Sequence, residues 1–257
     1  MNIFIIQLIL LVFLSLTLWI ISLKLKKVSI IDIFWPIFFI IANLAACIIL
    51  HPPLGSALLV MIPVCVWGVR LCVHLAKRNI KNSEDIRYVN LKKKYGSLKE
   101  SWALWIVFLP QAILASLINF PLTVALIHGQ KLASKPIVIF GMSLFVIGFL
   151  FETIADLQLT NFLKKRSEKQ QIMNKGLWAW SRHPNYFGEC TLWWGFYFIS
   201  VGISENIFTI FSPILITFLL LRVSGVTMLD SVLKKTKPRY TDYIKNTSAF
   251  FPWPPKR

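Results

Sequence analysis

Five polar side chains of different chemistry fall within eight positions, directly before a hydrophobic run: Arg182, His183, Asn185, Tyr186 and Glu189. We expect a helix to begin at Pro184, because the first turn of a helix has spare N–H groups and proline lacks one. Asn185 and Glu189 then share a face, with Tyr186 beside Glu189. Arg182 and His183 precede the helix N-terminus, which can receive an anion. An interfacial anchor also uses Arg and aromatic residues, but it needs no His, Asn and Glu. The stretch therefore predicts a binding site at a membrane edge.

Other polar residues lie at the ends of hydrophobic stretches. Arg70, His74 and Arg78 are spaced by four residues and form one stripe on a helix. A charge inside an apolar span is costly and usually faces a polar interior. The alternative is that Arg78 snorkels to the interface and that His74 is simply packed. Arg70 lies deeper in the stretch, so the stripe is a candidate part of the site.

Two carboxylates, Glu152 and Asp156, are also four residues apart, and Asn161 follows them. Carboxylates on one face repel each other unless a cation or hydrogen-bond donors lie between them. Arg182 and the Arg70 stripe are the candidate cations, and a structural salt bridge is the alternative. The remaining candidates are in the last hydrophobic stretch and the tail: Arg222, and Tyr240 and Tyr243 on a short predicted helix.

Composition indicates a membrane protein. The chain has 257 residues and is 56% hydrophobic, yet it carries 28 Lys and Arg against 11 Asp and Glu. These facts agree if apolar residues form spans and charges form loops, as in a polytopic α-helical membrane protein. The net charge of +17 does not favour nucleic acid, since the basic residues lie between spans, where they suit anionic lipid. The four Cys form no CxxC pair, so we expect neither a disulfide nor a metal site.

The hydrophobic pattern predicts an all-α fold with about seven transmembrane helices and a single membrane domain over residues 1–257. A span needs about 20 residues, and the predicted spans are 3–23, 30–50, 54–76, 102–126, 136–155, 187–203 and 207–227. Basic residues gather in the first loop, the 77–101 loop, the 156–187 segment and the tail, whereas the 127–135 loop has only Lys131 and Lys135. By the positive-inside rule the N-terminus is outside and the C-terminus is cytoplasmic. We expect the first span to be retained rather than cleaved as a signal peptide.

These polar residues, which lie at the cytoplasmic ends of the predicted spans, would line one cavity that faces the cytoplasm. Arginine suits phosphates, carboxylates and amides suit ribose hydroxyls and base edges, and Trp and Tyr suit a flat ring. This inventory favours a nucleotide-type cofactor over an ion. No GxGxxG or GxxxxGK[ST] motif occurs, so neither a Rossmann nor a P-loop site is predicted.

Several motifs resemble those of the steroid 5α-reductase superfamily, and more closely those of a bacterial branch of it. They are EDIRY at 84–88, preceded by Arg78-Asn79, FETIADLQLTNF at 151–162, GLWAWSRHPNYFGE at 176–189, Ser224-Gly225, and KPRYTDY at 237–243. The resemblance extends from about residue 28 to the C-terminus.

This resemblance implies a membrane reductase, in the bacterial inner membrane, that binds NADPH from the cytoplasm. It implies cofactor contacts at Asp156, Asn161, Arg182, His183, Asn185, Tyr186, Glu189, Arg222, Tyr240 and Tyr243. The implied reaction reduces a carbon–carbon double bond conjugated to a carbonyl, in a lipophilic substrate that enters from the bilayer. A hydrogen-bond donor polarises the carbonyl, and this works best in a dry pocket.

One position departs from the pattern of the steroid reductases. Where they place a Tyr after the His of the third span, to bind the substrate carbonyl, Leu75 follows His74 here. Asp32, Tyr88, Tyr186 or His74 is then the candidate catalytic residue that replaces it, or the substrate is not a steroid-like enone.

Two other functions remain open. The isoprenylcysteine carboxyl methyltransferases share the RHPxYxG run and bind S-adenosylmethionine. The FE…AD…Q block, the SG pair and Asp230, where those enzymes have paired glutamates, favour the reductase. The third alternative is a lipid- or sterol-binding membrane protein without catalytic activity.

Overall fold

The computed structural model describes residues 2–80, 83–96, 101–129, 134–168, 170–223, 225–238 and 240–255. Over these ranges the chain is helical apart from its connections, and no strand occurs in them. The chain divides into two compact units, Met1–Ala133 with Ile203–Asn206, and Ser134–Gly202 with Ile207–Arg257. The single membrane domain predicted from the sequence stays a prediction.

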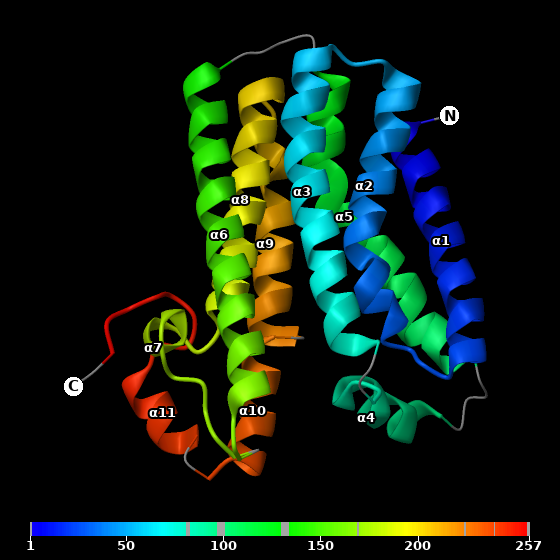
Figure 1. Ribbon diagram of the computed structural model, residues 1–257. Coiled ribbons are helices and arrows are strands. Elements are labelled where there is room, and N and C mark those ends of the chain that lie inside the picture. The colour runs from blue at the N-terminus through cyan, green and yellow to red at the C-terminus, as the bar shows by residue number, and fades with distance from the viewer. Residues whose placement is uncertain are drawn as a thin grey trace. The chain divides into compact units, whose positions relative to one another are not determined.

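The described residues of unit 1 form four long helices and one short helix, which Figure 1 labels. The long helices are α1 (Ile3–Leu25), α2 (Ile30–Leu50), α3 (Leu54–Asn79) and α5 (Leu109–Ile127), and α5 continues the π-helical segment η1 (Leu104–Phe108). The short helix α4 (Ile86–Tyr95) follows α3. Helix α2 packs against α1, α3 and α5, so it is the helix around which the unit is built.

A chain of buried side-chain hydrogen bonds joins α1, α2 and α5. Gln7 donates to the carbonyl oxygen of Ala42 at 2.9 Å, and the Thr123 hydroxyl donates to Gln7 Oε1 at 2.9 Å. Asn119 donates to Thr123 at 3.0 Å and accepts from Asn43 at 2.6 Å. In an apolar medium, polar groups that pair with each other hold helices together, so this chain of bonds stabilises unit 1.

Unit 2 begins with α6 (Lys135–Lys165), which is followed by the short helix α7 (Leu177–Trp180) and by α8 (Pro184–Ser204). Helix α8 begins at Pro184, as predicted from the sequence. A further run consists of η2 (Ile207–Ile210), α9 (Phe211–Phe218), η3 (Leu219–Val223) and α10 (Val226–Thr236), and the last helix is α11 (Tyr240–Asn246).

Helices α6 and α8 are in direct backbone contact along a seam of glycines spaced by seven residues: Gly141 and Gly148 on α6, and Gly188, Gly195 and Gly202 on α8. A Cβ added at Gly148 would lie 2.6 Å from the Gly188 carbonyl oxygen, and one added at Gly195 would lie 2.7 Å from that of Gly141. Small residues at such an interface allow helix backbones to approach closely. The seam therefore sets the register that brings the carboxylates of α6 to the first turn of α8.

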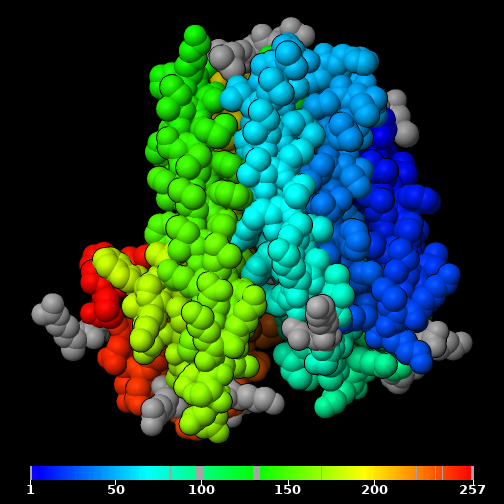
Figure 2. All heavy atoms as spheres, in the orientation of Figure 1, coloured from blue at the N-terminus to red at the C-terminus, as the bar shows by residue number. Residues whose placement is uncertain are grey.

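Six helical stretches among the described residues are long and apolar enough to cross a membrane: Ile3–Leu25, Ile30–Leu50, Leu54–Asn79, Leu104–Ile127, Lys135–Lys165 and Ile207–Lys234. Helix α8 has 21 residues, but its Asn, Glu, Trp, Tyr and Gly residues lower its hydropathy, and it is not one of the six. Figure 2 shows surfaces of α3 and α6. Helix α3 exposes Ile62, Val66 and Val73, and helix α6 exposes Ile139 and Ile147. Such apolar surfaces suit lipid, and the chain is of the membrane-spanning type.

Candidate functional site

A carboxylate on α10 joins three of the residues predicted for the cofactor site. Asp230 accepts hydrogen bonds from Arg182 Nη2 at 2.7 Å, from His183 Nε2 at 3.0 Å and from the Tyr240 hydroxyl at 2.6 Å. All four residues belong to unit 2, and only 10% of the Arg182 side chain and 13% of the Asp230 side chain are exposed. We call these four residues the Asp230 cluster.

Arg182 also ties the C-terminal segment to the start of α8. Its Nη1 donates to the carbonyl oxygens of Thr247 at 2.9 Å and Ile244 at 3.2 Å, and its backbone N–H donates to Ser248 at 2.8 Å. Its Nε is buried and has no hydrogen-bond partner in the part of the chain that the structure describes. The charge of Arg182 is thus compensated by Asp230, while its buried Nε–H is left as a donor for another group.

The first turn of α8 presents the other predicted polar residues. The Tyr186 ring stacks on the His183 ring, with a centroid distance of 5.6 Å and an interplanar angle of 4°. Asn185 donates to Asp156 of α6 at 3.2 Å, and Glu189 accepts from Trp193 Nε1 at 2.9 Å. The structure therefore brings most of the predicted cofactor residues to the junction of α6, α8 and α10.

Two tyrosines of α11 keep their protons throughout the physiological range. Burial raises the pKa of Tyr240, and its hydrogen bond to the Asp230 carboxylate raises it further. Burial likewise raises the pKa of Tyr243, whose hydroxyl donates to the carbonyl oxygen of Trp178 at 2.5 Å. Both hydroxyls therefore stay donors. Tyr240 fastens α11 to Asp230 of α10, and Tyr243 fastens it to Trp178 in the segment before α8.

The loop before α7 is shaped by a glycine and by a side chain of α6. Gly176 has φ 62°, and a Cβ there would lie 2.6 Å from Gln158 Nε2. Gln158 Oε1 accepts from the backbone N–H of Leu177 at 3.0 Å, at the first residue of α7. A positive φ and this close approach favour glycine. The pair fixes where the chain enters α7 and hence where Arg182 lies.

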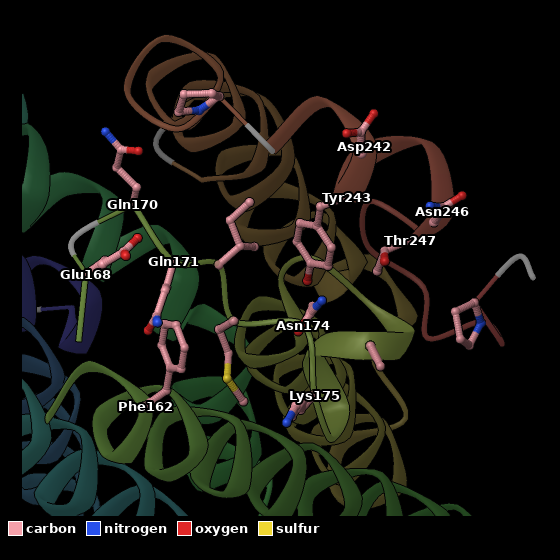
Figure 3. A pocket seen from close by; sticks show the side chains of 15 residues that line it. Phe162, Glu168, Gln170, Gln171, Asn174, Lys175, Asp242, Tyr243, Asn246 and Thr247 are labelled. Atoms are coloured by element: carbon pink, nitrogen blue, oxygen red, sulfur yellow. The ribbon is translucent and has the colours of Figure 1, made fainter. Parts of the chain in front are cut away.

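A cleft of about 1010 Å³ opens beside the cluster within unit 2. Figure 3 shows Asp242, Tyr243, Asn246 and Thr247 on one side of it and Phe162 and Lys175 on another. Most of its lining is polar. Of the predicted site residues only Tyr243 lines it, and Tyr243 and Thr247 connect it to Trp178 and Arg182 through the hydrogen bonds above.

Two predicted cofactor residues stand apart from the Asp230 cluster. The side chains of Asn161, on α6, and Arg222, in η3, are exposed. No hydrogen bond joins either of them to the cluster among the described residues, and Ser224 of the SG pair lies outside those residues. Their assignment to the cofactor stays a prediction.

A second polar cluster lies in unit 1 and contains two of the predicted catalytic residues. Asp32, in the first turn of α2, accepts from the Tyr88 hydroxyl at 2.5 Å and from Arg87 Nη2 at 2.7 Å. Burial raises the pKa of Tyr88 well above its ordinary value, and the charge of Asp32 raises it further. Burial opposes the charge of Arg87, but Asp32 and Asp85 outweigh it, so the pKa of Arg87 is raised. Tyr88 and Arg87 both stay protonated.

The neighbouring residues of the EDIRY motif cap helices. Glu84 accepts from the backbone N–H groups of Val28 at 2.5 Å and Ser29 at 3.1 Å, just before α2. Asp85 accepts from the backbone N–H of Arg87 at 2.9 Å and caps α4. Carboxylates at helix N-termini satisfy free N–H groups and are stabilised by the helix dipole. The motif therefore fastens α4 to the start of α2, which is a structural role.

His74, in α3 of unit 1, is half-buried, whereas Tyr186 belongs to unit 2. The four catalytic candidates are thus distributed as Asp32, Tyr88 and His74 in one unit and Tyr186 in the other. The structure places Asp32 and Tyr88 in contact. Which of the four is the catalytic residue stays a prediction.

We expect Asp32→Asn to loosen α4. The amide keeps the shape of the carboxylate. In either orientation, however, its NH₂ group faces another donor, either the Arg87 guanidinium or the Tyr88 hydroxyl. Removal of a charged acceptor of this kind lowers stability by about 1–2 kcal/mol. Hydrogen exchange measured by mass spectrometry should show faster exchange of the α4 amides, whereas Lys93→Gln, at an exposed position of α4, should leave it unchanged. Unaltered protection of the α4 amides in Asp32→Asn would contradict the conclusion that Asp32 holds α4 through Arg87 and Tyr88.

Asp230 is the functional candidate for which sequence reasoning assigned no role. One signal was present: Asp230 is the sole acidic residue between positions 207 and 236, a stretch that also holds Arg222 and two lysines. A lone carboxylate among apolar and basic residues requires a partner. That partner could not be identified from the sequence, because Arg182 is 48 positions away.

Comparison with known proteins agrees with this architecture. The family described as "Protein of unknown function (DUF1295)" matches residues 18–247. An uncharacterized protein of Schizosaccharomyces pombe is 24% identical over 286 residues, which cover 98% of this chain and 80% of that protein. No solved structure matches the chain. The chain belongs to the DUF1295 family, which is part of the steroid 5α-reductase-like group.

Proposed function

We propose that this chain is a membrane-embedded, NADPH-dependent reductase of a carbon–carbon double bond in a lipophilic substrate. The observation that carries the proposal is the convergence of Arg182, His183 and Tyr240 on Asp230 at the start of α8. Membership of the steroid 5α-reductase-like group supports it. In the same place, Tyr186 stacks on His183 and adds a flat aromatic surface.

The donors and acceptors of the cluster fit the uncharged polar parts of the cofactor. Arg182 Nε is a buried donor without a partner among the described residues, and Asn185 and Asp156 offer an amide and a carboxylate to hydroxyl or carboxamide groups. Since Asp230 already compensates the charge of Arg182, we expect other cations to bind the phosphates. Bound NADPH supplies the hydride, and the residues of the chain hold it and exclude water.

The proposed topology has seven spans, with α8 as the sixth. Helix α8 is long enough to cross, and its glycine seam packs it against α6, so α8 does not need a wholly apolar surface. An odd number of spans puts the two termini on opposite sides. The basic loops then place the N-terminus outside and the C-terminus in the cytoplasm, where the cofactor is available. We propose the bacterial inner membrane as the location, with substrate entering from the bilayer.

The donor that polarises the substrate carbonyl is proposed among Tyr88, His74, Tyr186 and Asp32. Tyr88 retains its proton because its pKa is raised, and it directs this proton to Asp32. Tyr88 would reach a substrate only by exchanging that bond for one to the carbonyl.

The proposal is tested by reduction of lipophilic enones. Purified protein in detergent or lipid nanodiscs is mixed with NADPH and a panel of steroid, terpenoid and fatty enones, and the loss of NADPH absorbance is followed. We expect at least one enone to be reduced at its double bond, with product confirmed by mass spectrometry. Absence of turnover across a panel of this breadth, with NADPH bound, would contradict reductase activity.

A further inference from the structure

We propose that Asp230 is the positioning residue of this site: it sets the hydrogen position of His183 and the orientation of the Arg182 guanidinium. The inference rests on the proposed function, because it assigns both residues to cofactor binding. Its structural part stands on geometry alone. One carboxylate receives three donors within 3.0 Å, and they come from the segment before α8 and from α11.

The hydrogen position follows from the chemistry of the acceptor. An ionised carboxylate only accepts hydrogen bonds, so the His183 nitrogen 3.0 Å from Asp230 Oδ1, which is Nε2, must carry a hydrogen. In the neutral ring, Nδ1 is then an acceptor. The stacked Tyr186 ring and the backbone bond from His183 N–H to Ser181 Oγ at 3.1 Å hold the residue in place. Asp230 thereby decides which nitrogen of His183 offers a lone pair to a ligand.

The orientation of Arg182 follows in the same way. Asp230 Oδ2 holds Nη2 at 2.7 Å, and the carbonyls of Thr247 and Ile244 hold Nη1. With both Nη atoms held, the plane of the guanidinium is fixed, and the buried Nε–H, which has no hydrogen-bond partner among the described residues, is a donor for a ligand. The carboxylate also makes the Arg182–Asp230 pair neutral. The site therefore reads a neutral hydrogen-bonding group of the cofactor, such as its carboxamide or a ribose hydroxyl.

Asparagine cannot reproduce this arrangement although it has nearly the same shape. It offers one acceptor oxygen and one NH₂ group, while donors approach both Asp230 oxygens. If the NH₂ group faces Arg182, two donors oppose each other; if it faces His183, the imidazole must present a lone pair at Nε2 and move its hydrogen to Nδ1. Either outcome disturbs one of the two groups that Asp230 positions.

The experiment combines nitrogen NMR of the histidine rings with cofactor binding. The full-length protein, with ¹⁵N-labelled histidine, is studied in detergent as wild type, Asp230→Asn, Asp230→Glu and Glu205→Gln. Glu205 is an exposed carboxylate that follows the opposite end of α8 and serves as the control, and His183→Gln assigns the His183 signals. NADPH dissociation constants are measured on the same samples.

We expect wild type and Glu205→Gln to show hydrogen on Nε2 of His183. We expect Asp230→Asn to alter the His183 ring signals and to weaken NADPH binding about tenfold or more, as for loss of a charge-assisted hydrogen bond. Asp230→Glu, which keeps the carboxylate, should restore the Nε2–H form at least in part.

A neutral Nδ1–H ring in wild type would overturn the inference even if Asp230→Asn does not fold. Unchanged His183 signals and unchanged NADPH affinity in a folded Asp230→Asn protein would also overturn it. Failure of wild type to bind NADPH is a different result: it would contradict the proposed function, while the ring signals would still decide whether Asp230 positions His183.

Discussion

Alanine in place of Gly148 is expected to lower the free energy of unfolding by about 1–3 kcal/mol, the usual effect of inserting a methyl group into a closely packed interface. The added Cβ would lie 2.6 Å from the Gly188 carbonyl oxygen of α8 and closer still to the Leu192 amide nitrogen. These are backbone atoms, so the helices must move apart. That movement would also draw Asp156 away from Asn185, whose hydrogen bond lies two turns further along the same interface.

The matched control is Gly55→Ala, near the start of α3. A Cβ at Gly55 would meet no atom within 4 Å, and alanine is a better helix former than glycine. Unfolding in detergent should therefore show Gly55→Ala as neutral or slightly more stable and Gly148→Ala as clearly less stable. Equal stability of the two variants would contradict the glycine seam.

Removal of Arg182 is expected to have the second large effect. In Arg182→Ala the Asp230 carboxylate, which is 13% exposed, loses its cation, and the C-terminal segment loses its bonds to the guanidinium. Breaking a fully buried ion pair costs about 3–5 kcal/mol, and we expect about 2–3 kcal/mol here because the pair is partly exposed. NADPH binding should be lost or weakened by a factor of about 100.

Thermal unfolding of Arg182→Ala, with and without NADPH, separates these two effects. Lys164→Ala removes a positive charge from an exposed position of α6 in the same unit, and it should change neither stability nor the NADPH-induced shift. If Arg182→Ala keeps a wild-type shift with NADPH, then Arg182 is a purely structural residue and the cofactor site lies elsewhere.

The helical pattern was predictable because apolar length and caps are local properties. The stretch predicted at 3–23 is helix Ile3–Leu25, and α8 starts at Pro184. The last predicted span, 207–227, lies within the apolar helical stretch Ile207–Lys234, which runs through η2, α9, η3 and α10. Gly225 lies against the carbonyl of Leu220, a close approach that only glycine permits and that no periodicity in the sequence reveals.

The site was predictable in its residue types but not in its pairing. The sequence pointed to Arg182 and His183, yet the group that binds both is Asp230, and a partner across 48 positions becomes visible only when the chain is folded. The same holds for Asp32, which the structure joins to Tyr88 and Arg87. Within the EDIRY motif, Asp85 pairs with Arg87, whereas Glu84 accepts from a backbone N–H just before α2.

The seven-residue spacing of glycines had a meaning that the sequence alone did not disclose. In the sequence, Gly195 and Gly202 simply interrupt the predicted span 187–203, because glycine is a poor helix former. In the structure each faces the backbone of α6. Glycine lowers the mean hydropathy of such a helix even though the packing requires it. This helps to explain why α8 is not among the six apolar stretches.

Cofactor selectivity tests the central claim most directly. The purified protein in detergent is heated with NADPH, NADH, S-adenosylmethionine or no addition, and the unfolding temperature is recorded. We predict stabilisation by NADPH, a smaller or no shift with NADH, and none with S-adenosylmethionine, since ligands that bind only the folded state raise its stability. Stabilisation by S-adenosylmethionine alone would contradict the reductase account and indicate a methyltransferase.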